Sequence, residues 1–208
     1  MSTCHYQLNL PKKPLRPGIK FTDFKHCADR RFPGSSHQYN LIPKMVLSEE
    51  LLHLLDEHGV KDSVITVFSL HSRPLSQALL HSDILLVNNE WKSASYGINW
   101  ELNGHCPIFS WWETRRSPAY PTRENYFKMY PQGIHYGLRG QTGIEPEDIQ
   151  LDQAILSDTA LLVRTDVPHT VHFSDRKEKL RLAMSLRFLD STDITWQQSV
   201  EKFSTLII

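Results

Sequence analysis

Short β-type runs separated by turn residues dominate the sequence from about residue 60 to residue 190, and this pattern restricts the fold more than any other feature. Each run is rich in β-branched, aromatic and other apolar residues, and Gly, Pro, Asn and Ser lie between the runs. The runs are 63–70 (SVITVFSL), 77–88 (QALLHSDILLVN), 93–102 (SASYGINWEL), 106–112 (CPIFSWW), 160–164 (ALLVR), 170–173 (TVHF) and 180–188 (LRLAMSLRF). Many short strands with few helices predict an antiparallel barrel or sandwich supported by a helical buttress.

The clearest helix is predicted just before these runs. Ser48 is a suitable N-cap, Glu49 and Glu50 fill the first turn, and Gly59 ends the segment. Its apolar stripe consists of Leu51, Leu52, Leu54 and Leu55. Residues 1–45 contain several prolines and little periodicity, which indicates an irregular N-terminal arm. We therefore expect one domain over residues 1–208, with its β core in residues 60–190 and the charged turn 174–179 (SDRKEK) before the last strand.

Charge and composition disfavour several classes of protein. The 23 basic and 23 acidic residues give a formal net charge of zero, which disfavours a protein that binds nucleic acid by neutralising many phosphates. The apolar runs are too short to span a bilayer, and the first residues lack the apolar region of a secretory signal. Three cysteines without a CxxC spacing do not make a disulfide framework. We expect a cytoplasmic protein without a membrane partner, whose oligomeric state the sequence does not determine.

Two histidine-containing segments are candidates for metal ligands. His81 and Asp83 are two residues apart within the run ALLHSDILLV, so a strand would project both side chains from the same face. An ordinary surface histidine beside an aspartate is the alternative. His169 lies in the turn-like segment VPHTV, and His172 follows three residues later. Because these two histidines would face opposite sides of a strand, at most one points inward, and the sequence leaves open which one.

The last predicted strand offers a candidate anion-binding residue. Arg181, Ala183, Ser185 and Arg187 share one face of RLAMSLRF, and small residues beside an arginine leave room for a ligand. The planar guanidinium group of arginine binds both oxygens of a carboxylate. Solvated arginines on an amphipathic strand are the alternative.

Several other residues are predicted near the site. Asn99, Trp100, Trp111 and Trp112 could line the mouth of the barrel, at the substrate entrance, although the neighbours Trp111 and Trp112 would point to opposite faces of a strand, so that one of them is expected in the core. Asn88 and Asn89 follow the segment of His81 and Asp83 and could reach a substrate. The long segment 113–143 between core strands has the features of a lid or a binding loop, although a solvated connection has the same composition.

Two histidines and one aspartate make the facial triad of non-haem Fe(II) oxygenases, which leaves three coordination positions open on one side. With these residues in this order, the sequence resembles the Fe(II)/2-oxoglutarate-dependent oxygenase superfamily, whose core is a double-stranded β-helix. His81 and Asp83 match the His-x-Asp part of the family pattern, VPHTV resembles its distal-histidine turn, and Arg181 matches its arginine on the next strand. The segment GINWELNGHCPIFSWWE also looks like the strand pair that follows His-x-Asp in prolyl-hydroxylase-like and phage-type members.

The resemblance implies an iron-dependent hydroxylase with two small cofactors, Fe(II) and 2-oxoglutarate. It implies that His81, Asp83 and His169 bind Fe(II) as the catalytic residues. It implies further that Arg181, helped by the Ser185 hydroxyl, binds the distal carboxylate of 2-oxoglutarate. The expected substrate is a small molecule, an amino acid or a peptide side chain. A cupin-type metalloenzyme that uses no 2-oxoglutarate, and a cupin-like metal- or ligand-binding protein without turnover, are the alternatives.

Overall fold

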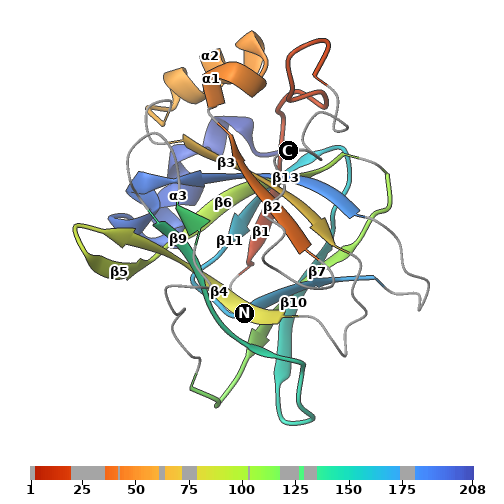
Figure 1. The fold of residues 1–208 in the computed structure, drawn as a ribbon, viewed down its shortest axis with the longest axis vertical. Coiled ribbons are helices and arrows are strands. Elements are labelled where there is room, and N and C mark those ends of the chain that lie inside the picture. Colours follow the sequence, from red (N-terminus) through yellow and green to blue (C-terminus); the bar gives the residue numbers. More distant parts are fainter. Residues whose placement is uncertain are drawn as a thin grey trace.

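The structure is a computed structural model, and it describes residues 3–19, 36–41, 43–60, 64–71, 79–102, 104–117, 127–128, 135–173 and 181–208. Within these ranges the strands form two antiparallel sheets (Figure 1). One has the order β1-β11-β6-β13-β3-β2, and the other has the order β10-β7-β12-β4-β9-β8 with β5 beside β4. The strands are β1 (His5–Leu8), β2 (Ser36–Leu41), β3 (Val64–His71), β4 (Leu79–Val87), β5 (Glu90–Ser93), β6 (Tyr96–Glu101), β7 (Ile108–Glu113), β8 (Phe127–Lys128), β9 (His135–Thr142), β10 (Ile149–Ile155), β11 (Ala160–Arg164), β12 (His169–His172) and β13 (Arg181–Phe188).

The order of strands within the sheets identifies the architecture. β13 lies between β3 and β6, and β12 lies between β4 and β7, so neighbours in each sheet come from distant parts of the chain. The chain passes back and forth between the sheets, as it does in a jelly roll or double-stranded β-helix. The predicted mainly β fold class is therefore confirmed.

Each predicted β run overlaps a strand, but the sequence did not reveal all of the strands. The edge strand β10 was missed because its side chains are mostly exposed and its apolar alternation is short, limited to residues 149–152. Strands β8 and β9 lie inside the segment 113–143, where β9 pairs with residues 79–86 of β4. The predicted turn 174–179 lies outside the described residues.

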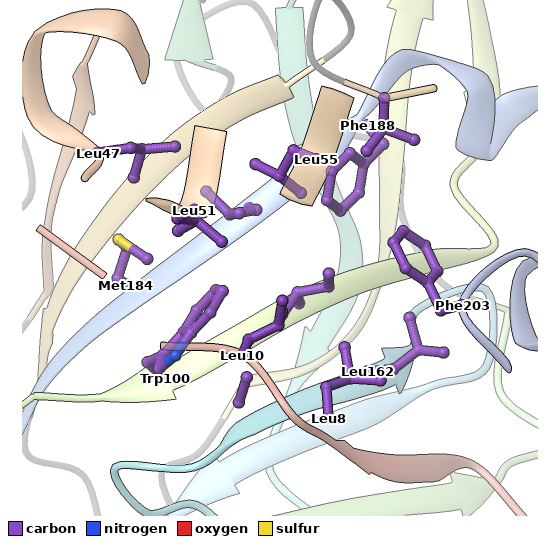
Figure 2. Close-up of a cluster of buried hydrophobic side chains, with 14 of the residues drawn as sticks. Leu8, Leu10, Leu47, Leu51, Leu55, Trp100, Leu162, Met184, Phe188 and Phe203 are labelled. Carbon is purple, nitrogen blue, oxygen red and sulfur yellow. The ribbon is translucent and has the colours of Figure 1, made fainter. Parts of the chain in front are cut away.

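A helical layer covers the outer face of the six-stranded sheet. Helix α2 (Glu49–Glu57) begins where the Ser48 hydroxyl accepts a hydrogen bond from the Leu51 backbone N–H, and Gly59 follows it with a φ of +66°. The other helical segments are α1 (Pro43–Val46), α3 (Trp196–Lys202), η4 (Leu189–Thr192) and η5 (Ser204–Leu206). Figure 2 shows Leu51 and Leu55 of α2 packed near Trp100, Met184 and Phe188 of the sheet. Burial of this apolar surface attaches the helices to the sheet.

Alternation along β6 separates the helix-facing side of this sheet from the barrel interior. Tyr96, Ile98 and Trp100 belong to the cluster beneath the helices, so Gly97, Asn99 and Glu101 face the other sheet. The prediction that Trp100 lies at the substrate entrance is therefore wrong. A second apolar cluster lies between the sheets and contains Cys4, Phe109, Trp111, Ala154, Leu156, Leu161 and Val163.

The first strand closes one edge of the barrel. β1 pairs with β11, and the Leu8–Asn9 segment also contacts residues 206–207 through a β-bridge and a backbone hydrogen bond. The Asp152 carboxylate of β10 accepts a hydrogen bond from the Cys4 backbone N–H at 2.8 Å and another from the His5 ring at 3.1 Å. This carboxylate thereby links the edge strands of the two sheets. Among the described helices, none is both long and apolar enough to cross a membrane.

Candidate metal centre

The barrel interior brings two histidines and one aspartate to a single point. Candidate ligand atoms of His81, Asp83 and His169 all lie within 4.8 Å of one another. The Nε2 atoms of His81 and His169 are each 3.8 Å from Oδ1 of Asp83. Strand pairing explains the convergence, because His81 of β4 and His169 of β12 are direct cross-strand partners, while Asp83 follows two residues later on the same face of β4.

The His169 ring is oriented by its own turn. Its Nδ1 lies 2.9 Å from the carbonyl oxygen of Val167, which can only accept, so Nδ1 carries the proton. Nε2 therefore presents its lone pair toward Asp83 and His81. Burial lowers the pKa of His169 to about 3, helped by the neighbouring His81. The imidazole is thus neutral at physiological pH, the form in which histidine binds metals.

His172 does not share this environment. It is three residues from His169 and belongs to the opposite face of β12, where its Nδ1 lies 3.5 Å from the Thr170 hydroxyl. Of the two histidines that the sequence left open, the structure brings only His169 to His81 and Asp83.

An arginine that the sequence did not single out fixes the Asp83 carboxylate. Nε of Arg187 lies 2.6 Å from Oδ2 of Asp83, on the carboxylate oxygen that does not face the histidines. The Asp83 side chain is fully buried and that of Arg187 is 7% exposed, so this is an ion pair inside the barrel. Nη1 of Arg187 also donates to Oδ1 of Asn99 at 3.0 Å. Arg187 thereby compensates the buried charge of Asp83 and determines which oxygen is presented to a metal.

A glycine makes room for this arginine. Gly97 of β6 is the cross-strand partner of Arg187, and a Cβ built on Gly97 would lie 2.3 Å from Nη1. The guanidinium group therefore lies against the bare backbone of β6. This close approach is a structural reason for glycine inside a buried strand, where it is otherwise unfavourable.

The remaining predicted residues are placed less completely. Ser185 is buried on the interior face of β13, opposite Asn99 of β6. Glu101 of β6 is also buried on the interior face of this sheet, opposite Ala183 of β13. Arg181 begins β13 opposite His71, but its side chain lies outside what the structure describes. The sheet thus has a row of interior polar positions that leads from Arg187 toward the start of β13.

The backbone corrects the expectation for Asn88 and Asn89 and agrees with the one for the two neighbouring tryptophans. Asn88 and Asn89 have φ values of 53° and 65° and form the exposed turn between β4 and β5, at the far end of β4 from His81. They are turn residues of a hairpin, a role for which asparagine is suited. Trp111 and Trp112 face opposite sides of β7 as predicted, and both are buried.

The segment 113–143 is anchored near its start by Arg116. Arg116 forms an ion pair with the buried Asp148 and donates a hydrogen bond to the Gly143 carbonyl oxygen. The Glu145 backbone N–H also donates to Asp148, at 2.9 Å. These contacts fasten the exit from β7 to the turn that precedes β10. Arg116 therefore has a structural role in this part of the fold.

No protein-family model matches the sequence, and no curated protein matches it. Among solved structures, the chain is similar to a prolyl-4-hydroxylase from Pseudomonas putida, with 12% identity, a TM-score of 0.39, and coverage of 88% of this chain and 91% of that one. It is also similar to procruciferin, an 11S globulin from Brassica napus, with 10% identity, a TM-score of 0.35, and coverage of 80% and 28%. A vicilin from Solanum melongena is similar as well, with 11% identity, a TM-score of 0.34, and coverage of 89% of this chain and 43% of that one. The chain spans less than half the length of these two globulins. Likeness at this level says nothing about activity.

Proposed function

We propose that the protein is an Fe(II)- and 2-oxoglutarate-dependent oxygenase that hydroxylates a small molecule, an amino acid or a peptide side chain. The observation that carries the proposal is the convergence of His81, Asp83 and His169 inside the barrel, with ligand atoms within 4.8 Å of one another. Two imidazoles and one carboxylate on neighbouring strands fit the facial triad of non-haem iron oxygenases. In this proposal these three residues hold the metal.

The protonation and orientation of the three side chains fit a divalent metal. His169 is held as the neutral tautomer with Nε2 directed inward, and Arg187 holds Asp83 so that one oxygen remains turned to the histidines. Outer partners of this kind orient ligands and tune metal sites. Iron and 2-oxoglutarate, when bound, would supply the oxidising chemistry that activates O2 for hydroxylation, and the protein supplies binding, orientation and exclusion of water.

Charge balance favours an anionic co-substrate. Arg187 compensates Asp83, so a divalent ion would leave a net positive charge in the interior even with the buried Glu101 counted as a second carboxylate. Of the interior polar positions, Ser185 and position 181 lie on the same face of β13 as Arg187, and we assign Arg181 and the Ser185 hydroxyl to the distal carboxylate of 2-oxoglutarate. A strand rises about 3.4 Å per residue, so about 20 Å separates the backbone at 181 from that at 187, and a five-carbon dicarboxylate bound at the metal would reach position 181 only through the length of the arginine side chain.

The substrate would approach from the side of His81. The His81 side chain is 15% exposed, whereas Asp83 is fully buried and His169 is 1% exposed. The cross-strand partner of His81 on the neighbouring strand β9 is Gly140. A residue without a side chain at this position leaves space next to the least buried of the three proposed ligands.

Anaerobic titration with Fe(II) and then 2-oxoglutarate tests the proposal. Chelation of iron by the co-substrate should give a weak visible charge-transfer band. His169→Ala should abolish it, and His172→Ala, on the opposite face of the same strand, should leave it intact. Arg181→Ala should weaken 2-oxoglutarate affinity without abolishing iron binding. Thermal unfolding of each variant verifies that it is folded.

The outcomes separate the competing functions. Bound iron without the band would contradict the use of 2-oxoglutarate and favour a cupin-type metalloenzyme. Absence of iron binding in the folded protein would favour a binding protein without turnover.

A further inference from the structure

A row of aromatic rings in contact leads from the candidate metal centre to the protein surface, stacked at both ends and tilted between Phe109 and Trp111. The ring centroids of His169 and Phe109 are 4.8 Å apart, those of Phe109 and Trp111 are 4.5 Å apart, and those of Trp111 and His5 are 5.5 Å apart. The His169 side chain is 1% exposed, whereas that of His5 is 25% exposed. We call these four residues the ring row. It crosses from β12 through β7 to β1 and connects the barrel interior with solvent.

Trp111 is the oxidisable member of the ring row, and its surroundings favour a positive charge on the indole. Asp152 of β10 is its direct cross-strand partner. The carboxylate of Asp152 also lies 3.1 Å from Nδ1 of His5, whose ring stacks on Trp111 with an interplanar angle of 9°. A fixed negative charge beside a buried ring stabilises a cation there more strongly than it would in water. The nearby Arg164 guanidinium is itself paired with Asp166 at 2.8 Å.

The indole N–H of Trp111 is directed at a weak base. Nε1 donates to the backbone carbonyl oxygen of Arg164 at 2.7 Å. A peptide carbonyl accepts a hydrogen bond but does not remove the proton from an indole. An oxidised Trp111 would therefore retain its proton and persist as a radical cation.

The adjacent tryptophan provides an internal comparison. Trp112 lies on the opposite face of β7, donates its indole N–H to the Thr170 hydroxyl at 3.2 Å, and has the neutral Gln150 as its cross-strand partner. Both tryptophans are buried and belong to the same strand. They differ in whether they face His169 and in whether a carboxylate lies opposite.

We propose that Trp111 is a protective electron donor to the metal centre, which reduces the iron-centred oxidant when it forms without a substrate to hydroxylate. This inference rests on the proposed function. One electron would leave the indole of Trp111 for an oxidant formed at the iron, together with one proton from water, which leaves hydroxide. A second electron and proton, supplied in the same way once the indole is restored, would return the iron to the divalent state. The indole becomes a radical cation that keeps its N–H. A small thiol reductant at the exposed edge of His5 returns one electron and restores the indole, and the thiol gives up a proton as it is oxidised.

The structural consequence is protection of the metal ligands. An enzyme that generates a strong oxidant must prevent its side reactions. His81 and His169 surround the site of oxidation, and damage to either would destroy it. Trp111 contacts Phe109, which stacks on His169, and Asp152 is its partner on the next strand. This tryptophan would offer the oxidant a reversible one-electron reaction instead.

Hydrogen peroxide and the Fe(II)-loaded protein, without 2-oxoglutarate, test this inference. Peroxide generates an oxidant at the bound iron directly, so the readout does not depend on the co-substrate. Stopped-flow absorption should detect a tryptophan radical in the wild-type protein, and peptide mapping should place most oxygen incorporation at Trp111. A sample treated with a chelator before peroxide is added should show neither.

Variants of the two tryptophans and of Asp152 make the test specific. Trp111→Phe keeps a ring in the row but should lose the radical signal, and oxidation of His81 and His169 should rise several-fold. Trp112→Phe should behave like wild type. Asp152→Asn retains both tryptophans and the size of the side chain, and should give a lower yield of radical.

The outcomes distinguish this inference from the function on which it rests. The role of Trp111 would be overturned if wild type and Trp111→Phe gave an equal radical signal, or if Trp111→Phe and Trp112→Phe lost the signal equally. Either result would leave iron binding established. Absence of bound iron in the folded protein would overturn both proposals. Thermal unfolding before peroxide is added shows whether each variant is folded.

Discussion

The contact between Gly97 and Arg187 makes a quantitative prediction about stability. Gly97→Ala would place a Cβ 2.3 Å from Nη1 and 3.0 Å from Cζ of Arg187, and 3.0 Å from the Leu186 carbonyl oxygen. These separations are too short for non-bonded contact, so the guanidinium group must move. Its present position is held by Asp83 at 2.6 Å and Asn99 at 3.0 Å. The substitution therefore acts on a buried ion pair although it adds only a methyl group.

The expected cost follows from the two terms involved. Breaking a buried ion pair and leaving one charge uncompensated costs about 3–5 kcal/mol. Replacing glycine by alanine within a strand restores roughly 0.5–1 kcal/mol. We therefore expect Gly97→Ala to lower the free energy of unfolding of the metal-free protein by about 2–4 kcal/mol. Equilibrium urea unfolding measures this change, and the melting temperature should fall by about 2–4 °C for each kcal/mol.

A double-mutant cycle isolates the cause. In an Arg187→Ala background the added methyl group meets no guanidinium and only the Leu186 carbonyl oxygen at 3.0 Å remains close, so Gly97→Ala should change stability by no more than about 1 kcal/mol. The same loss in both backgrounds would refute the role assigned to the arginine, and so would a wild-type background that tolerates the alanine.

Three further predictions concern the pH dependence of stability, the sheet edges and the helical layer. The free energy of unfolding of the metal-free protein should fall as pH decreases from 6.5 toward about 3. In this range the unfolded chain protonates His169 at its ordinary pKa of 6.5, whereas burial and His81 keep the folded residue neutral. Urea unfolding across this range should show a weaker dependence of the unfolding free energy on pH for His169→Phe. Asp152→Ala should cost about 1–3 kcal/mol, because it leaves the Cys4 N–H without its acceptor at the edge of the barrel, and hydrogen exchange at that amide should rise; unchanged exchange would contradict the link. Leu51→Ala should cost about 2–5 kcal/mol in urea unfolding, because Leu51 is fully buried beneath helix α2, whereas the exposed His53→Ala should be nearly neutral.

The sequence predicted the fold class because strand signals in a double-stranded β-helix are local. Ser48 and the leucine stripe of α2 were recognised for the same reason, since capping and helical periodicity depend on neighbouring residues. Strand β10 was missed because an exposed edge strand does not need apolar alternation. Its place in the sheet comes from pairing with β7, about 40 residues away in the chain.

The candidate site shows the same division between local and long-range information. His81 and Asp83 are two residues apart, so their common face follows from strand geometry alone. Arg181 and Arg187 also share a face, and the sequence could not determine which of them meets Asp83. That depends on the register of β13 against β6, where Arg187 lies opposite Gly97. Trp100 was misplaced because assigning the two faces of β6 required knowing which one the helices cover.

The position of β1 has a consequence for the order of folding. Residues 5–8 lie beside β11 in the finished sheet, and Leu8 and Asn9 contact residues 206–207. A ribosome releases the chain in sequence, so this early segment emerges long before its sheet partner and its last contacts exist. Closing so long a loop is entropically unfavourable until other contacts have formed. Until residues 206–207 emerge, β1 lacks these contacts, so residues made well before their sheet partner are some of the last to be fixed.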